Sequence, residues 1–338
     1  MKIEFQRLTL RLRHPWRIAR ERTQETKEVL LVRVGNGFGE IVPSPFYGET
    51  TETATVVLQH YAEELGDLPD EAPIQAVLSR LDRGLRGHPA ARAGLEMALW
   101  DQLGRRANLP LWRLWGVDPA RMPVTSFTIG LDTPERMQQK AREAPEGTVL
   151  KVKLGTEEDL EIVRSLRDVT DRPIRVDANT AWTPQEAVRK IEALERLGVE
   201  LIEQPVAAED REGLRYVRER SPLPILADES APNADAVPDL VGAADGVNVK
   251  LNKCGGLLEA LRMIHVARTH RLRVMVGCMI QTSIGIAAAA QLAPLADWVD
   301  LDGNLHVLND PFQGPRLEAG RLLLTEAPGL GVRYRSGT

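Results

Sequence analysis

Five short apolar segments decide the fold: LKVKLG (150–155), IRVDAN (174–179), LIEQP (201–205), ILADES (225–230) and VNVKLN (247–252). Each carries a polar side chain at its end, and in chain order these are Lys153, Asp177, Glu203, Asp228 and Lys250. Successive positions are 24, 26, 25 and 22 residues apart. That is the length of one strand, one helix and two loops, so the spacing predicts βα units in a parallel barrel. The carboxyl ends of all barrel strands meet at one mouth, where we expect the five side chains to converge.

The three carboxylates at this mouth predict a metal site. Acidic groups brought together without basic partners repel one another unless a cation lies among them. Carboxylate oxygens suit a hard divalent ion, and Mg²⁺ commonly keeps open positions for water and substrate. We predict one divalent ion per subunit, Mg²⁺ or alternatively Mn²⁺, bound by Asp177, Glu203 and Asp228. The alternative, in which each carboxylate caps the next helix, suits one segment better than five segments in register.

Lysine usage points to proton transfer at the same place. Only eight of the 43 basic residues are lysines, and half of them lie in KVK (151–153) and KLNK (250–253). Unlike arginine, lysine can lose its proton when it is desolvated or lies beside another cation. We predict that Lys153 and Lys250 are the catalytic pair. Lys151 shares a strand face with Lys153, whereas Lys253 lies on the face opposite to Lys250 and is expected to be a loop residue.

Four further polar residues follow strand ends. Asn179 shares a face with Asp177 and is expected to bind metal-bound water or the substrate, whereas Glu229 is out of phase with Asp228 and is expected behind the metal ligands. In WVDLDG (298–303), Asp300 and Asp302 point the same way. They lie too far around the barrel to join the metal ligands, so we expect them to bind a cation on the substrate.

These motifs resemble the enolase superfamily in its muconate-lactonizing subgroup, and most of all its dipeptide epimerases of the L-Ala-D/L-Glu type. The matching stretches are Lys151-Val-Lys153, Asp177-Ala-Asn179, Glu203-Gln-Pro205, Asp228-Glu-Ser230, Lys250-Leu-Asn-Lys253 and Asp300-Leu-Asp302. Residues 91–116 also resemble the amino-terminal domain of that superfamily. The resemblance implies an α/β fold: an enolase-type (β/α)7β barrel with an α+β amino-terminal capping domain that the carboxy-terminal tail completes.

The resemblance also implies a reaction. In this superfamily a base removes the proton α to a carboxylate, and Mg²⁺ stabilises the resulting ene-diolate. Lys153 would take the proton from one face and Lys250 would return it from the other, which gives epimerisation. Lys151 is expected to contact the substrate carboxylate and to disfavour protonation of Lys153.

The substrate expectation rests on two groups of charges. Dipeptide epimerases carry Asp-x-Asp where this chain has Asp300 and Asp302, and those carboxylates would bind the free α-ammonium of a dipeptide. Arg17, Arg20 and Arg22 could receive an acidic side chain, so L-Ala-D/L-Glu is the leading candidate. Hydrophobic and cationic dipeptides remain open.

We expect three regions: a capping domain (1–117), a barrel (118–312) and a tail (313–338) that packs back on the capping domain. Within the capping domain, residues 1–45 read as an antiparallel meander, and residues 51–66 and 73–116 read as helices. The charged stretch 17–28 is too polar to pack as core, so we expect a solvated loop, and the resemblance implies that this loop is a mobile lid over the mouth. The first barrel strand is expected at 124–130, and the last two at 273–279 and 298–303.

Composition narrows the class of protein. The net charge of −5 is mild, with no basic stripe, so we expect no nucleic-acid partner. The amino terminus lacks the apolar core of a secretory signal, and the apolar run 284–299 is too short and interrupted to span a bilayer, so no membrane partner is expected. Cys254 and Cys278 form no paired motif, which fits a cytoplasmic protein. A homo-oligomer remains open.

Other functions remain open at this point. A Schiff-base aldolase would also use a barrel lysine, but it needs no trio of carboxylates. A binding protein on the same scaffold is a further possibility, because fold does not fix function. Within the superfamily, N-acylamino acid racemase, o-succinylbenzoate synthase and muconate cycloisomerase share the same core.

Overall fold

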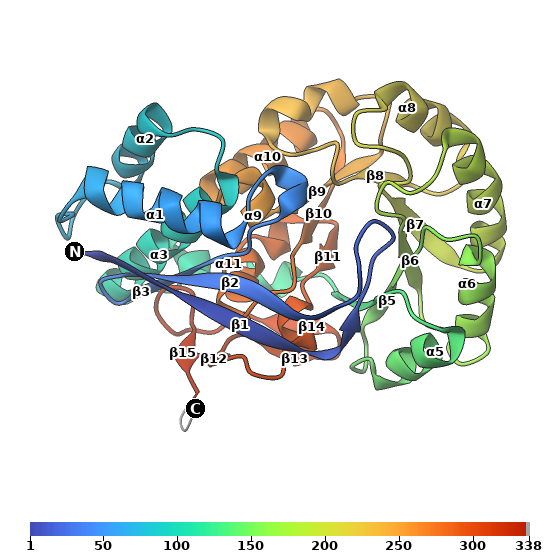
Figure 1. Cartoon of the computed structure of the whole chain (residues 1–338), viewed down its shortest axis with the longest axis horizontal. Coiled ribbons are helices and arrows are strands. Elements are labelled where there is room, and N and C mark those ends of the chain that lie inside the picture. Colours follow the sequence, from blue (N-terminus) through green and yellow to red (C-terminus); the bar gives the residue numbers. More distant parts are fainter. Residues whose placement is uncertain (336–338) are drawn as a thin grey trace.

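The computed structural model describes residues 1–335, in which a small antiparallel sheet and a group of helices lie beside an eight-stranded parallel barrel (Figure 1). The barrel strands follow one another in chain order from β4 to β11. The predicted α/β class, with a barrel and an amino-terminal α+β domain, is confirmed.

The capping sheet consists of β1 (Ile3–Trp16), β2 (Gln24–Val34) and β3 (Gly37–Ile41), paired antiparallel as the meander predicts. The predicted loop at 17–28 is too long, because residues 24–28 belong to β2. Their backbone groups pair with β1, for example Lys27 opposite Leu10, so charged side chains did not prevent strand formation. The loop itself spans only residues 17–23.

Four helices complete the capping domain: α1 (Thr51–Leu65), α2 (Ile74–Gly84), α3 (Pro89–Ala107) and α4 (Leu111–Leu114). Pro110 precedes α4 as its N-cap residue. The sheet packs against α3 at very close range, since a Cβ on Gly39 would lie 1.9 Å from the carbonyl oxygen of Gly94. Glycine at this position therefore permits the sheet and the helix to touch.

Each barrel strand lies near the segment that the sequence predicts. The strands are β4 (Ser126–Ile129), β5 (Val149–Lys153), β6 (Ile174–Asp177), β7 (Val199–Glu203), β8 (Ile225–Ala227), β9 (Gly246–Lys250), β10 (Arg273–Gly277) and β11 (Trp298–Asp300). All residues of β4 to β9 are buried except Glu200, because the outer helices cover one face and the barrel core covers the other.

The helices around the barrel are α5 (Pro134–Glu143), α6 (Asp159–Arg167), α7 (Pro184–Arg196), α8 (Arg211–Arg220), α9 (Leu251–Cys254), α10 (Leu257–Thr269) and α11 (Ser283–Ala290). Helix α7 shows how the sequence specifies them: Thr183 and Glu186 form a reciprocal cap, and Pro184 begins the helix. Within residues 1–335, no helix is long and apolar enough to cross a membrane.

The barrel closes between its first and last strands through few interactions. Thr125 forms a parallel bridge with Val299, and its hydroxyl accepts a hydrogen bond from the Leu301 amide at 2.8 Å. From β6, the buried Arg175 donates to the Val299 carbonyl at 3.0 Å and to the Ser126 hydroxyl at 3.2 Å. The arginine therefore supports the seam between β4 and β11.

The carboxy-terminal segment forms two short antiparallel pairs, β12 (Phe312–Gln313) with β15 (Arg333–Tyr334), and β13 (Arg316–Glu318) with β14 (Arg321–Leu323). It contacts the capping domain, as expected: the Leu330 amide donates to Asp101 at 2.7 Å, and Arg105 donates to the Val332 carbonyl at 2.9 Å. Residues 336–338 of the predicted tail lie outside the described residues. The domain limits at 117 and 312 stay predictions.

Glu40 fixes the capping sheet to the barrel. Its carboxylate accepts hydrogen bonds from the amide and hydroxyl of Thr282, both at 2.8 Å, and from the Gly285 amide at 3.0 Å, at the start of α11. Burial raises the pKa of Glu40 to about 7, although these three donors oppose the shift. The contact sets the height of the sheet above the barrel mouth.

Candidate active site

The carboxyl ends of the barrel strands bring the predicted residues to one place, as the spacing of the five segments requires. Lys153 lies beside Asp177 in the ladder between β5 and β6, and Asp177 lies beside Glu203 in the next ladder. On the far side of the barrel, Gly277 of β10 pairs with both Lys250 and Asp300. Asp228 follows β8 directly.

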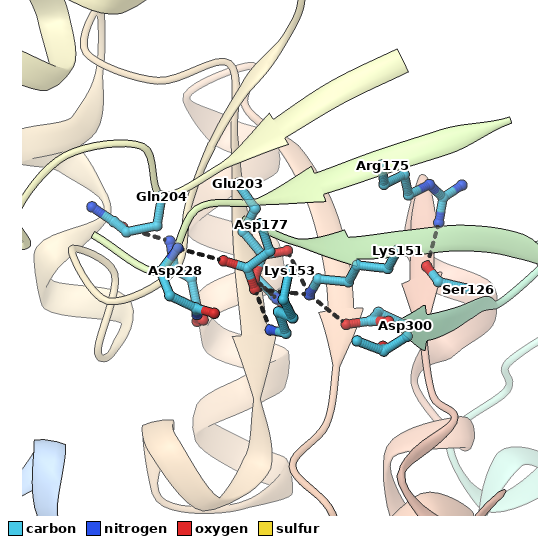
Figure 2. A network of polar contacts seen from close by, with 12 residues as sticks. Ser126, Lys151, Lys153, Arg175, Asp177, Glu203, Gln204, Asp228 and Asp300 are labelled. Carbon is cyan, nitrogen blue, oxygen red and sulfur yellow. Dashed lines mark hydrogen bonds and ion pairs between the residues drawn. The ribbon is translucent and has the colours of Figure 1, made fainter. Parts of the chain in front are cut away.

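Lys151 lies at the centre of this group. Its ammonium nitrogen is 2.6 Å from Asp300, 2.8 Å from Glu203 and 3.3 Å from Asp177. Figure 2 shows the side chain reaching between Asp300 on one side and the other two carboxylates on the other side. Only 1% of its surface is exposed. The expected contact of Lys151 with a substrate carboxylate stays a prediction.

Lys153 and Lys250 each bind a different carboxylate. The ammonium of Lys153 donates to Asp177 at 2.6 Å, and that of Lys250 donates to Asp228 at 2.6 Å. Lys250 also lies 3.9 Å from Glu203. The two lysines come from β5 and β9, which are separated by β6, β7 and β8, so they approach the carboxylates from different sides.

These charges determine the ionisation of the buried groups. Burial disfavours the carboxylate of Asp177, but Lys153 and Lys151 outweigh it and hold its pKa well below the usual range. Burial and the charge of Asp177 raise the pKa of Glu203 to about 7. Burial lowers the pKa of Lys250, but Asp228 and Glu203 outweigh this effect and raise it. The lysines therefore stabilise the anionic form of Asp177, whereas the charge of Asp177 disfavours that of Glu203.

Several oxygens at the site lack a hydrogen-bond partner within residues 1–335: Asn179 Oδ1, Glu203 Oε2, Glu229 Oε2, Asn248 Oδ1 and Asp300 Oδ1. All are buried acceptors, and Glu203 Oε2 meets Lys151 only as an ion pair without hydrogen-bond geometry. Unsatisfied buried oxygens of this kind fit a bound cation. Within the described residues, no three acidic side chains are arranged as a complete set of metal ligands. Lysine ammoniums form ion pairs with these carboxylates instead.

Lys253 differs from its expected position. It is not a loop residue but a buried member of the single-turn helix α9, 2% exposed. Its ammonium donates to the carboxylate and the carbonyl of Asp228 and to the carbonyl of Asn248, each at 2.7 Å. The chain turns into α9 directly after Lys250, so strand alternation no longer applies beyond that residue.

Gln204, which the sequence analysis did not single out, holds the end of β8. Its side-chain oxygen accepts from the amides of Asp228 at 2.9 Å and Ser230 at 3.1 Å, and its nitrogen donates to the Val206 carbonyl and the Ser230 hydroxyl. Its backbone adopts a left-handed conformation, with φ of 36°. A left-handed conformation at a buried glutamine indicates a positioning role. This conformation can be seen only in the structure, so the sequence did not indicate the role.

Glu229 and Asn179 lie beside the carboxylates, beyond the ends of β8 and β6. Arg20 donates to Glu229 at 2.5 Å, and its guanidinium lies 4.3 Å from the centre of the Phe46 ring. The backbone amide of Asn179 donates to the Asp177 carboxylate at 2.9 Å. Burial and the charge of Asp228 raise the pKa of Glu229. Arg20 is therefore occupied by a protein carboxylate in this structure.

Asp300 and Asp302 differ in their surroundings. Asp300 ends β11 and keeps one buried oxygen without a hydrogen bond, whereas Asp302 lies beyond the strand. Asp302 accepts hydrogen bonds from the Thr128 amide and from His306, the latter at 2.9 Å. Both carboxylates line one cavity with Lys151. The two-residue alternation thus placed Asp302 correctly at the mouth although the strand stops before it.

The loop 17–23 covers this cavity. Its Ile18, Arg20 and Glu21 line the cavity together with the barrel residues, and the Arg17 carbonyl accepts a hydrogen bond from the Leu131 amide at 2.9 Å. Figure 1 shows the β1–β2 hairpin extending towards β5 and β6. Arg22 is exposed and does not line the cavity, so its expected contact with the substrate stays a prediction.

This arrangement matches known families. The family model described as "Enolase C-terminal domain-like" matches residues 135–337, and the model of the mandelate racemase/muconate lactonizing enzyme N-terminal domain matches residues 2–116. The chain belongs to the mandelate racemase/muconate lactonizing enzyme family. The resemblance to the enolase superfamily that the motifs indicated is therefore confirmed.

Several relatives of this chain within the family are dipeptide epimerases. An L-Ala-D/L-Glu epimerase of Bacteroides thetaiotaomicron is 38% identical over 98% of this chain and 88% of its own length. A hydrophobic dipeptide epimerase of Enterococcus faecalis is also 38% identical, over 92% of this chain and 90% of its own. A solved dipeptide epimerase of Enterococcus faecalis, complexed with Mg and L-Leu-L-Tyr, superimposes with a TM-score of 0.91 at 35% identity and covers 98% of this chain and 99% of its own.

We expect that Lys253→Met lowers the free energy of unfolding by about 3 to 5 kcal/mol, because the buried Asp228 carboxylate loses a charged partner. Urea unfolding monitored by circular dichroism in the presence of a chelator measures the change without bound metal. The exposed Lys2 provides the control: Lys2→Met should change stability by less than about 0.5 kcal/mol. Equal stability of the two variants would contradict the positioning role of Lys253.

Proposed function

We propose that this protein is a metal-dependent epimerase that removes and returns the α-proton of a dipeptide. The observation that carries the proposal is the placement of Lys153 and Lys250, which approach one cluster of carboxylates from β5 and β9. A substrate carbon between the two lysines has one on each face. Removal of a proton from one face and its return from the other inverts the configuration.

Asp177, Glu203 and Asp228 would hold one divalent ion, for which Mg²⁺ is our choice. The unsatisfied oxygen of Glu203 and the strongly favoured anionic forms of Asp177 and Asp228 support this assignment. When bound, the ion would offset the second negative charge that a carboxylate substrate gains on losing its α-proton. Asn248 donates to Glu203 at 2.9 Å and Lys253 donates to Asp228, so both orient the proposed ligands from behind.

The two lysines would exchange roles with the configuration of the substrate. A neutral amine on one lysine takes the proton from the α-carbon, and the ammonium of the other donates a proton to the opposite face. Asp177 contacts Lys153 and Asp228 contacts Lys250, so each lysine is held by one of the proposed metal ligands. A bound cation would weaken these ion pairs, because it competes for the same carboxylate oxygens, and would make deprotonation easier.

Asp300 and Asp302 would bind the α-ammonium of the dipeptide. Asp300 has one buried oxygen with no hydrogen-bond partner within residues 1–335, and an ammonium is the donor that would satisfy it. Asp302 is held by the Thr128 amide and by His306, so its position is fixed before the substrate binds. N-acyl amino acids and succinylbenzoates lack this ammonium and would leave this one oxygen of Asp300 without a hydrogen-bond donor.

The names of the relatives support a dipeptide substrate but differ in its second residue. Curated relatives include both L-Ala-D/L-Glu and hydrophobic dipeptide epimerases. Solved neighbours of other activities share the fold as well: a muconate lactonizing enzyme of Pseudomonas fluorescens has a TM-score of 0.91 at 27% identity, covering 99% of this chain and 96% of its own. The substrate therefore has to be decided by the residues of the cavity, and L-Ala-D/L-Glu is our proposal.

The test is exchange of the α-hydrogen in deuterated water. We expect that mass spectrometry of a dipeptide library with the protein and Mg²⁺ shows a gain of one deuterium in the substrate. Excess chelator should abolish the gain, and added Mg²⁺ should restore it, because the second charge on the substrate is no longer offset without the ion. A protein that labels no dipeptide, or that labels one equally well in chelator, would refute the proposal.

Two single variants separate the lysines. Lys153→Ala and Lys250→Ala should each reduce epimerisation by at least about 100-fold, because each removes one member of the acid–base pair. Each variant should still exchange the α-hydrogen of one substrate epimer, the one whose α-hydrogen its remaining lysine faces. Polarimetry and deuterium incorporation measure the two properties separately. A Lys250→Ala protein that epimerises at the normal rate would exclude the two-base mechanism.

Acetylation of the substrate tests Asp300 and Asp302. The N-acetyl form of the preferred dipeptide should show a value of kcat/KM at least about 100-fold lower, since the free oxygen of Asp300 loses the charged donor that the α-ammonium would supply. The rate of epimerisation at several concentrations of both substrates gives the ratio. If acetylation has no effect, these carboxylates do not bind an ammonium and an N-acylamino acid racemase becomes the better assignment.

A further inference from the structure

The cavity over the barrel mouth has two walls of different origin. The lower wall carries the charged barrel residues, among them Lys151, Lys153 and Lys250. The upper wall comes from the capping domain and includes Leu12 of β1 and Lys27 of β2. Because a substrate must lie between the walls, side chains of the upper wall contact the part of the substrate that does not react.

Lys27 extends from an apolar face of the capping sheet. It lies directly opposite Leu10 on β1, and alternation along β2 places Val29 on the same face. Leu10 and Val29 are fully buried and pack with Val42 and Val307 in one apolar cluster. A lysine at the edge of such a cluster is held away from water, and burial lowers its pKa against the opposing charge of Glu21.

Lys27 is also the basic residue of this cavity that lacks a partner. The other basic side chains that line it are paired: Arg20 with Glu229, Lys151 with three carboxylates, Lys153 with Asp177, Lys250 with Asp228 and His306 with Asp302. Within residues 1–335 the Lys27 ammonium forms no hydrogen bond or ion pair, and the nearby Glu21 accepts instead from Gln24 at 3.2 Å. A half-buried cation without a partner is costly unless a ligand supplies an anion.

We infer that Lys27 binds the side-chain carboxylate of the second residue of the dipeptide, so that the protein selects an acidic residue at that position. The inference rests on the proposed function, because it assumes that a dipeptide lies in the cavity with its reacting carbon at the lysines of the barrel. Leu12, Ile18 and Val42 line the same wall and would cover the methylene groups of a glutamate side chain.

Arg20 is less suited to this role, although the sequence favoured it. Its guanidinium already binds Glu229 at 2.5 Å and lies on the Phe46 ring. A substrate carboxylate would have to compete with Glu229, which is itself buried and would then lose its partner. Lys27 needs to give up no such interaction.

The test compares two substrates of equal shape, L-Ala-L-Glu and L-Ala-L-Gln, with wild-type protein and Lys27→Met. We expect the wild type to prefer the glutamate dipeptide by at least about 30-fold in kcat/KM, because glutamine leaves the ammonium without an anion. In Lys27→Met the preference should fall to about one, through loss of activity on L-Ala-L-Glu, while activity on L-Ala-L-Gln changes little. The same substitution at the exposed Lys2 should keep the preference.

Reversing the charge at Lys27 distinguishes a change in substrate selectivity from a general defect in folding. Lys27→Glu should make L-Ala-L-Glu the poorest substrate and should raise kcat/KM for L-Ala-L-Lys above its wild-type value, which a merely structural defect would not do. Equal loss on all dipeptides in both variants, or a wild type that accepts glutamate and glutamine alike, would overturn the inference. If the wild type labels no dipeptide in deuterated water, the proposed function fails instead.

Discussion

The balance of buried charge at the barrel mouth is the constraint on which the rest of the structure depends. The single ammonium of Lys151 forms ion pairs with Asp177, Glu203 and Asp300. Lys253 donates a hydrogen bond to Asp228. Burying any of these groups without its partner would cost several kcal/mol. The strand ends must therefore stay at fixed positions so that opposite charges remain in contact. The barrel strands, the seam between β4 and β11 and the outer helices together fix these positions.

The same balance explains how one site can be both stable and reactive. Each lysine of the proposed acid–base pair forms an ion pair with a carboxylate that would also be a metal ligand. A divalent ion would satisfy those oxygens and release the lysines towards the substrate. The ion pairs that stabilise the fold and the proposed metal site would thus use the same carboxylates with different partners.

Much of this could be predicted from the sequence, and the exceptions have physical causes. The spacing of Lys153, Asp177, Glu203, Asp228 and Lys250 gave the barrel and the convergence of the site, because one βα unit has a nearly constant length. Strand alternation failed at Lys253, where the chain turns into a helix, and the charge of residues 24–28 concealed a strand whose hydrogen bonds come from β1. The pairing of Arg20 with Glu229 could not be predicted from the sequence, because the two residues are 209 positions apart.

The upper wall of the cavity belongs to a different part of the chain from the residues that would perform the chemistry. Glu40 anchors that wall to α11 through three hydrogen bonds, none of which involves Lys27 or a barrel lysine. In evolutionary terms, substitutions along β1 and β2 can change which side chain is accepted without disturbing the proton-transfer machinery below. Substrate range would then change through the capping sheet, while the barrel strands that carry Lys153 and Lys250 stay as they are.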